Sequence, residues 1–284
     1  MKTYFDCIPC FLSQALRAAR LVSGDPAMHE RVLRNVLRKT AEIDFSQSPP
    51  AMGRWIYAMV KEIAGHEDPY QTIKQNFNAV ALELLPEFRK IIACADDPFE
   101  AALRLAIAGN IIDFGVHGDI RPEDVRNILE DALIRDLTGD VRAFQSAVER
   151  AERILYLGDN AGEIVFDRLF IEQMDPRKII FGVRGAPVIN DVTLEDARAS
   201  GITDLVRVVA NGSDAPGTLL DRCSAEFREI FTAADLVIAK GQGNYESLSG
   251  ADQNIFFLFM VKCPVVAAHT GLPQGSRVIF HNPL

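Results

Sequence analysis

The second half of this chain alternates short apolar runs with longer segments of helical period, and this alternation is what most constrains the fold. It is typical of βαβ units, in which parallel strands are connected through helices. We therefore predict an α/β fold with a mostly parallel sheet and flanking helices. Strands are expected near residues 153–157, 178–183, 205–209, 235–239, 255–260 and 277–280, and helices near residues 162–174, 192–200, 216–231 and 245–250.

The first half has a different pattern, with apolar residues recurring every three to four positions. Examples are Phe11, Leu12, Ala15, Leu16 and Ala19, and then Val32, Leu33, Val36 and Leu37. This spacing is typical of amphipathic helices. We predict an all-helical N-terminal subdomain over residues 1–140 and a metal-binding α/β domain over residues 141–284, and a connecting helix is possible from Val141 to Arg153.

Composition excludes several functional classes. The formal charge of -9 argues against a nucleic-acid partner, because such binding depends on clustered Lys and Arg. The most apolar run, Ile255 to Val261, is too short to cross a bilayer, so we expect no membrane association. The N-terminal stretch lacks the long apolar segment of a signal peptide, and five cysteines, an odd number, fit reduced thiols. We expect a cytoplasmic protein.

Polar residues follow three of the predicted strands. Gly158, Asp159 and Asn160 follow the first, Asn190 and Asp191 come after the second, and Lys240 closes the fourth. In open parallel sheets, ligands bind outside the carboxyl ends of the strands. An Asp-Asn pair at such a point is also a common turn or helix N-cap, and both interpretations apply to Asp159 and Asn160.

The chemistry of these residues indicates a metal and an anion. Asp and Asn oxygens suit a hard divalent cation such as Mg²⁺ or Mn²⁺. The helix expected after Gly162 would place free N–H groups near an anion. Lys240 precedes Gly-Gln-Gly-Asn244 and is either a solvated strand end or the point charge that a phosphate beside a metal requires. Asn110 and Asp113 share one helical face, as a buried capping pair or as cleft residues.

Cys7-Ile-Pro-Cys10 has the CxxC spacing of half a zinc site or of a redox pair. No second CxxC or CxxH supplies the other zinc ligands, and no strand precedes it as in thioredoxin-like motifs, so we interpret the pair as incidental or fold-specific. The chain also lacks GxSxG, GxxxxGK[ST] and a GxGxxG after a strand. These absences argue against serine hydrolases, P-loop ATPases and ordinary dinucleotide enzymes.

Taken together, the motifs resemble those of the DUF89 proteins, also called damage-control phosphatases or the ARMT1-like family. The resemblance is carried by Cys7-Ile-Pro-Cys10, Gly109-Asn110-Ile-Ile-Asp113, Gly158-Asp159-Asn160-Ala-Gly-Glu163, Asn190-Asp191 and Lys240-Gly-Gln-Gly-Asn244-Tyr-Glu246. They occur in the family's order across nearly the whole chain. The short form with an N-terminal CxxC is similar to the stand-alone prokaryotic and archaeal subgroup.

The resemblance implies a helical N-terminal region on a Rossmann-like α/β domain and metal-dependent hydrolysis of small phosphomonoesters, such as sugar phosphates or damaged phosphometabolites. It implies a divalent metal (Mn, Co, Ni or Mg) held by Asp159, Asn160 and Asp191. Lys240 matches the family's phosphate-contacting lysine, and Asn110 and Asp113 match polar residues near the substrate. Asn190 and Asn244, which lie within matching motifs, are also expected to bind substrate.

Some choices stay open at this level. Glu163, also placed at the substrate, and Asp113 are both candidates for the general base. Asp159 as a nucleophile lacks the DxDxT-type pattern of that chemistry. Two alternatives to a phosphatase are an S-adenosylmethionine-dependent methyltransferase and a non-catalytic, metal- or redox-responsive binding protein using Cys7 and Cys10.

Overall fold

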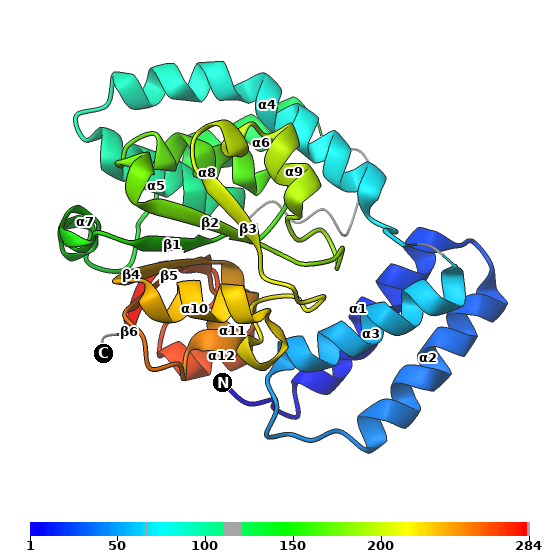
Figure 1. Ribbon diagram of the computed structural model, residues 1–284. Helices are drawn as coiled ribbons and strands as arrows, with labels where there is room; N and C mark the ends of the chain where they lie inside the picture. The colour runs from blue at the N-terminus through cyan, green and yellow to red at the C-terminus, as the bar shows by residue number, and fades with distance from the viewer. Residues whose placement is uncertain (66, 111–120, 283–284) are drawn as a thin grey trace.

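The computed structural model describes residues 1–65, 67–110 and 121–282. Within these residues, six strands form one sheet in the order β3-β2-β1-β4-β5-β6, as Figure 1 shows. All neighbouring strands are parallel except β5 and β6, which are antiparallel. The predicted α/β class is therefore confirmed. The strands are β1 (Ile154–Leu157), β2 (Ile179–Val183), β3 (Arg207–Ala210), β4 (Leu236–Lys240), β5 (Ile255–Met260) and β6 (Arg277–Asn282).

Helices cover both faces of the sheet, which explains why its central strands are almost continuously apolar. Tyr156 of β1 faces one hydrophobic core, and its neighbours Leu155 and Leu157 face the other. The first core is closed by α4 (Gln71–Ala93), α5 (Pro98–Gly109), α6 (Pro122–Ile134), α7 (Val141–Arg150), α8 (Glu163–Ile171) and α9 (Leu194–Ala199). The second is closed by α10 (Ala225–Ala233), α11 (Gly241–Leu248) and α12 (Pro264–Thr270).

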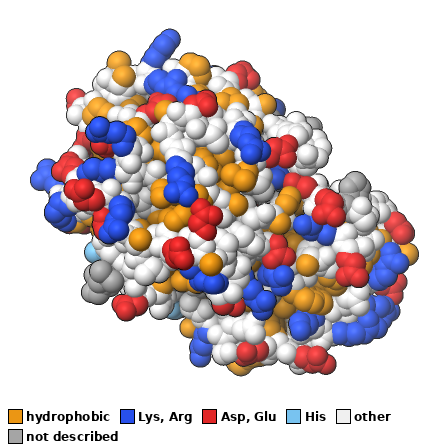
Figure 2. Space-filling view, in the orientation of Figure 1, with side chains coloured by type: hydrophobic (Ala, Val, Ile, Leu, Met, Phe, Trp, Pro, Cys, Tyr) orange, Lys and Arg blue, Asp and Glu red, His pale blue; other side chains and the backbone are white. Residues whose placement is uncertain are grey.

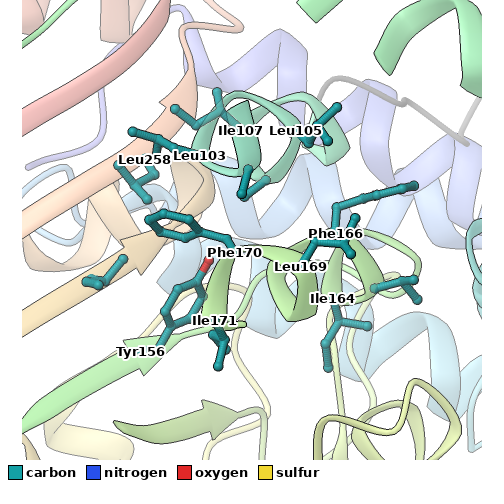
Figure 3. Packing of buried hydrophobic residues seen from close by; sticks show 14 of the residues in the cluster. Leu103, Leu105, Ile107, Tyr156, Ile164, Phe166, Leu169, Phe170, Ile171 and Leu258 are labelled. Atoms are coloured by element: carbon teal, nitrogen blue, oxygen red, sulfur yellow. The ribbon is translucent and has the colours of Figure 1, made fainter. Parts of the chain in front are cut away.

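The first core is densest where α5 lies on α8. Figure 3 shows Leu103, Leu105 and Ile107 of α5 above Leu169 and Phe170 of α8, with Tyr156 of β1 below them. All of these residues are fully buried. The side chains are apolar except that of Tyr156, whose hydroxyl donates a hydrogen bond to Asp167. Helix α5 is thus fixed to the sheet, and its C-terminal residues are carried to the carboxyl ends of the strands.

Three N-terminal helices form a separate lobe with a core of its own (Figure 1): α1 (Cys7–Val22), α2 (Pro26–Ala41) and α3 (Pro49–Ala64). That core also takes in Val188, from the loop after β2. Helices α4 to α7, although they belong to the helical first half of the chain, pack on the sheet instead. The predicted boundary at residue 140 stays a prediction.

Several predicted helix bounds were wrong. The helix expected over residues 216–231 begins only at Ala225, because Ser224 caps it by accepting a hydrogen bond from Phe227 N (3.1 Å). The helix expected over residues 245–250 begins at Gly241, directly after β4. Helix α1 begins at Cys7, so Cys7 and Cys10 lie in its first turn, and α12 was not predicted at all.

The surface carries both signs of charge. On the face in Figure 2, Lys and Arg are interspersed with Asp and Glu over both lobes, without the broad basic stripe that a polyanion would require. None of the helices in the described part of the chain has the length and apolar character needed to cross a membrane.

Candidate metal-assisted active site

The loops after β1 and β2 are joined into one structure at the carboxyl edge of the sheet. Asn160 and Asp191 form an antiparallel bridge. Ala161 N donates to Asn190 O (2.8 Å), and Val192 N donates to Asp159 O (2.8 Å). The two polar pairs that the sequence placed at neighbouring strand ends are therefore in contact through their main chains.

Two amide side chains lie between two carboxylates. Asn110 Nδ2 donates to Asp159 Oδ2 (2.7 Å) and to Glu163 Oε2 (3.0 Å). Asn160 Nδ2 donates to the same two oxygens, at 2.8 Å and 3.0 Å. Asn110, at the end of α5, thus reaches the loop after β1. Asp113, its predicted partner, lies outside the described residues.

Arg184, which follows β2 directly, is a functional candidate that sequence reasoning missed. Its side chain is buried, and its Nε donates to Asp191 Oδ2 at 2.6 Å while Nη2 lies 3.6 Å from Asp159 Oδ1. One cation therefore lies beside both acids. The sequence did contain a signal for Arg184. It directly follows the apolar run Ile179–Val183, so it could have been placed at the same carboxyl edge of the sheet as Asp159 and Asp191.

Lys240 lies beneath the side chains of Asp159, Asn160 and Asp191 and has no access to solvent. Its side chain is 0% exposed, as are those of Glu163 and Asp167. Nζ donates to Glu163 Oε1 (2.6 Å), to Asp167 Oδ1 (2.5 Å) and to Ala106 O (2.8 Å), which uses all three of its N–H donors. Burial alone would lower the pKa of Lys240, but the charges of Asp167 and Glu163 outweigh it and raise that pKa.

A cavity of about 300 Å³ opens in front of Asp159 and Asp191, between the sheet edge and the N-terminal lobe. Asp159, Asn160, Asn190 and Asp191 line it on one side. The predicted residues Asn110, Glu163, Lys240 and Asn244 do not line it; Asn244 Nδ2 instead donates to Lys240 O (2.8 Å). These four support the site from behind.

Other residues that line the cavity come from distant parts of the sequence, and sequence reasoning missed that they meet here. They include a cation, an acid and three thiols: Lys262, Glu246, Cys7, Cys10 and Cys263. Cys7 and Cys10, which the sequence left without a role, therefore face the same space as Asp159. Burial raises the pKa of both thiols, which disfavours their reactive thiolate forms.

The side chains at the sheet edge fit a hard divalent cation. Across the described residues, no three or more His, Cys, Asp and Glu side chains are gathered to hold a metal ion, so a site here needs an amide oxygen as third donor. Asn160 offers one, because both side-chain hydrogen bonds that the described residues show for it are made by Nδ2 and neither uses Oδ1. Burial, Glu163 and Asp191 raise the pKa of Asp159 to about 7, against the opposing effect of Arg184. An added cation would offset this crowding of negative charge.

Gly241 allows α11 to begin against Asp159. Its φ is +79°, and a Cβ built there would lie 1.9 Å from Asp159 Oδ2. Any side chain at this position would displace the carboxylate, so glycine is required both by the backbone conformation and by the close approach.

Glu246 is a second acid with an unusual environment. Its Oε1 accepts a hydrogen bond from Gln242 Nε2 (2.8 Å), and burial raises the pKa of its carboxyl to about 7. The charged or titratable groups around it are the N-terminal amine of Met1, Cys7 and Cys10.

We expect this raised pKa to appear as a pH dependence of stability. The folded state holds the proton of Glu246 more tightly than the unfolded state does, so the stabilisation is present at low pH and is lost as pH rises through about 7. Between pH 5 and pH 8, wild type should lose about 2 kcal/mol of unfolding free energy relative to Glu246→Gln. Urea unfolding of both proteins at each pH measures this, and a pH-independent difference would contradict it.

The chain is similar to known proteins over nearly its whole length. A family model described as "Damage-control phosphatase ARMT1-like domain" matches residues 3–278. A protein of Pyrococcus horikoshii named a damage-control phosphatase is 34% identical over 99% of both chains. One of Archaeoglobus fulgidus with the same name is 35% identical over 96% of each.

The fold is similar to that of a solved relative. The crystal structure of a DUF89 family protein from Pyrococcus horikoshii superposes with a TM-score of 0.88 at 33% identity, covering 99% of each chain. The likeness therefore extends over both the N-terminal lobe and the sheet with its flanking helices.

Proposed function

Because this chain belongs to the damage-control phosphatase ARMT1-like family, as its motifs predicted, we propose that it is a metal-dependent phosphatase acting on small phosphomonoesters. We propose sugar phosphates or damaged phosphometabolites as substrates. The observation that carries the proposal is the joining of Asp159, Asn160 and Asp191 in the lining of one cavity. A volume of about 300 Å³ suits a small ester.

Asp159, Asn160 and Asp191 would hold the divalent metal, which we propose to be Mn, Co, Ni or Mg. When bound, such a cation supplies charge stabilisation for the phosphoryl group and for the attacking water. The chain's own contribution is to hold the three oxygens in place. Arg184 fixes Asp191, and Asn110 fixes Asp159.

We propose Lys262 as the cation that contacts the substrate phosphate. It lines the cavity together with the two acids, and its positive charge acts on Asp159. Lys240, the residue expected from the motif, has its three donors engaged by Glu163, Asp167 and Ala106. A lysine with solvent access suits the dianionic group of a phosphomonoester, because it acts as a mobile point charge.

Metal removal tests the function directly. We expect protein stripped with EDTA to lose hydrolysis of p-nitrophenyl phosphate by at least about 100-fold, since the charge stabilisation from the cation is worth several kcal/mol. Mn²⁺, Co²⁺, Ni²⁺ or Mg²⁺ added singly should restore it. Full activity of protein shown to be metal-free would contradict the proposal. A panel of sugar phosphates and nucleotides would then define the substrate.

A further inference from the structure

One sheltered carboxyl group in the cavity has no part in the proposed metal site. Among the described residues that line this space, the acids are Asp6, Asp159, Asp191 and Glu246. Asp6 is exposed, and Asp159 and Asp191 are the proposed metal ligands. Glu163 and Asp167 are bonded to Lys240 and do not line the cavity. Glu246 is therefore the one acid among the described lining residues that is neither exposed nor a proposed metal ligand.

Helix α11 places Glu246 at a suitable distance from the metal site. The helix begins at Gly241, where an added Cβ would collide with the Asp159 carboxylate, and continues past Gln242 and Gly243 to Glu246, all three of which line the cavity. Five residues of α-helix advance by about 7.5 Å. That spacing leaves room for a phosphoryl group at Asp159 and for its ester oxygen near Glu246. Gln242, one turn earlier, donates to Oε1 and leaves Oε2 for a proton.

We propose that Glu246 is the general acid of this active site and protonates the oxygen that leaves phosphorus. The proposal rests on the proposed phosphatase function and adds a catalytic residue to it. Other functional groups that line the cavity suit the task less well. Lys262 is needed as a cation at the phosphate, and burial raises the pKa of the Cys7 and Cys10 thiols.

The proton balance of the step is simple. The oxygen of water bonds to phosphorus, and the bond from phosphorus to the ester oxygen breaks, with its electron pair staying on that oxygen. The ester oxygen takes the proton from Glu246 and departs as the alcohol. The proton that the resulting phosphate releases to solvent restores the carboxylic acid.

The environment of Glu246 supports this role. A carboxyl group whose pKa is raised to about 7 keeps a substantial protonated fraction at neutral pH, which suits a general acid. The titratable groups that face it, and that can also affect a pH profile, are the Met1 amine, Cys7 and Cys10, while the hydrogen bond from Gln242 opposes the rise in the pKa of Glu246. The more distant charges on the same cavity are Lys262, Asp159 and Asp191.

Dependence on the leaving group tests the proposal. Phenolate needs protonation as it departs, whereas 2,4-dinitrophenolate is stable without it. We expect Glu246→Gln to lower kcat/KM for phenyl phosphate by about 100-fold or more, and for 2,4-dinitrophenyl phosphate by no more than about threefold. Glu246→Asp, which keeps an acid, should fall between wild type and Glu246→Gln on phenyl phosphate. Glu149→Gln, exposed on α7, is the matched control and should match wild type.

The outcomes separate this role from the function itself. Equal losses on both esters would mean that Glu246 is structural, and unchanged rates on both would mean that it is dispensable; either result overturns the proposal. Wild type inactive on both esters with metal present would instead overturn the phosphatase function on which it rests. If Glu246→Gln fails to fold, the Glu246→Asp comparison on the two esters gives the same test.

Discussion

Asp159→Asn and Asp191→Asn should each lower kcat/KM for a phosphomonoester by at least about 10³-fold, equivalent to about 4 kcal/mol of transition-state stabilisation. Each change replaces a charged oxygen by a neutral amide of nearly the same shape. The metal would then have one anionic ligand instead of two, and Arg184 would face a single carboxylate. Both variants should still fold, because an amide is less costly to bury than an unpaired charge.

Two measurements make this result specific to the metal. In wild type, adding Mn²⁺ should raise the Tm, since a ligand that binds only the folded state stabilises it. In the two variants that rise should be absent or much smaller. Asp136→Asn, at an exposed position, serves as the control and should match wild type in both measurements. A folded Asp159→Asn protein with wild-type kcat/KM would rule out the proposed metal site.

The sheet and one wall of the site were predictable because their signals are local. An apolar run followed by Gly158, Asp159 and Asn160 marks both a strand and its carboxyl end within a few residues. Parallel topology then brings the next strand end alongside, as the Asn160–Asp191 bridge shows. Each step needs only neighbouring residues and a rule about sheets.

The rest of the cavity lining was not predictable because tertiary contacts bring it together. Cys7 and Cys263 are far apart in sequence and meet only because the N-terminal lobe sits against α11 and α12. The CxxC pattern around Cys7 indicates only Cys10 as a partner, and no pattern around Cys263 indicates Cys7. Lys240 illustrates a related difficulty: a lysine ending an apolar strand looks available, and only the approach of Ala106, Glu163 and Asp167 shows that its donors are used.

Lys240→Met should destabilise the folded protein by about 3–5 kcal/mol, because it leaves buried carboxylates without their cation. Glu163 and Asp167 are both 0% exposed. Burial already raises the pKa of Asp167 to about 6, although the charge of Lys240 opposes the rise. Methionine keeps much of the volume of lysine, so the loss reports charge and hydrogen bonds rather than a cavity. Urea unfolding measures it, and exposed Lys90→Met should stay within about 0.5 kcal/mol of wild type.

A second substitution distinguishes this structural role from a direct phosphate contact. Adding Asp167→Asn to Lys240→Met removes one of the uncompensated charges, so the double variant should be more stable than Lys240→Met alone. If Lys240 instead binds phosphate, Lys240→Met would change stability by less than about 1 kcal/mol while kcat/KM falls, and Asp167→Asn would restore nothing. Lys262→Met should lower kcat/KM with little change in stability. Lys262 faces the cavity, whereas Lys240 is held by two buried carboxylates.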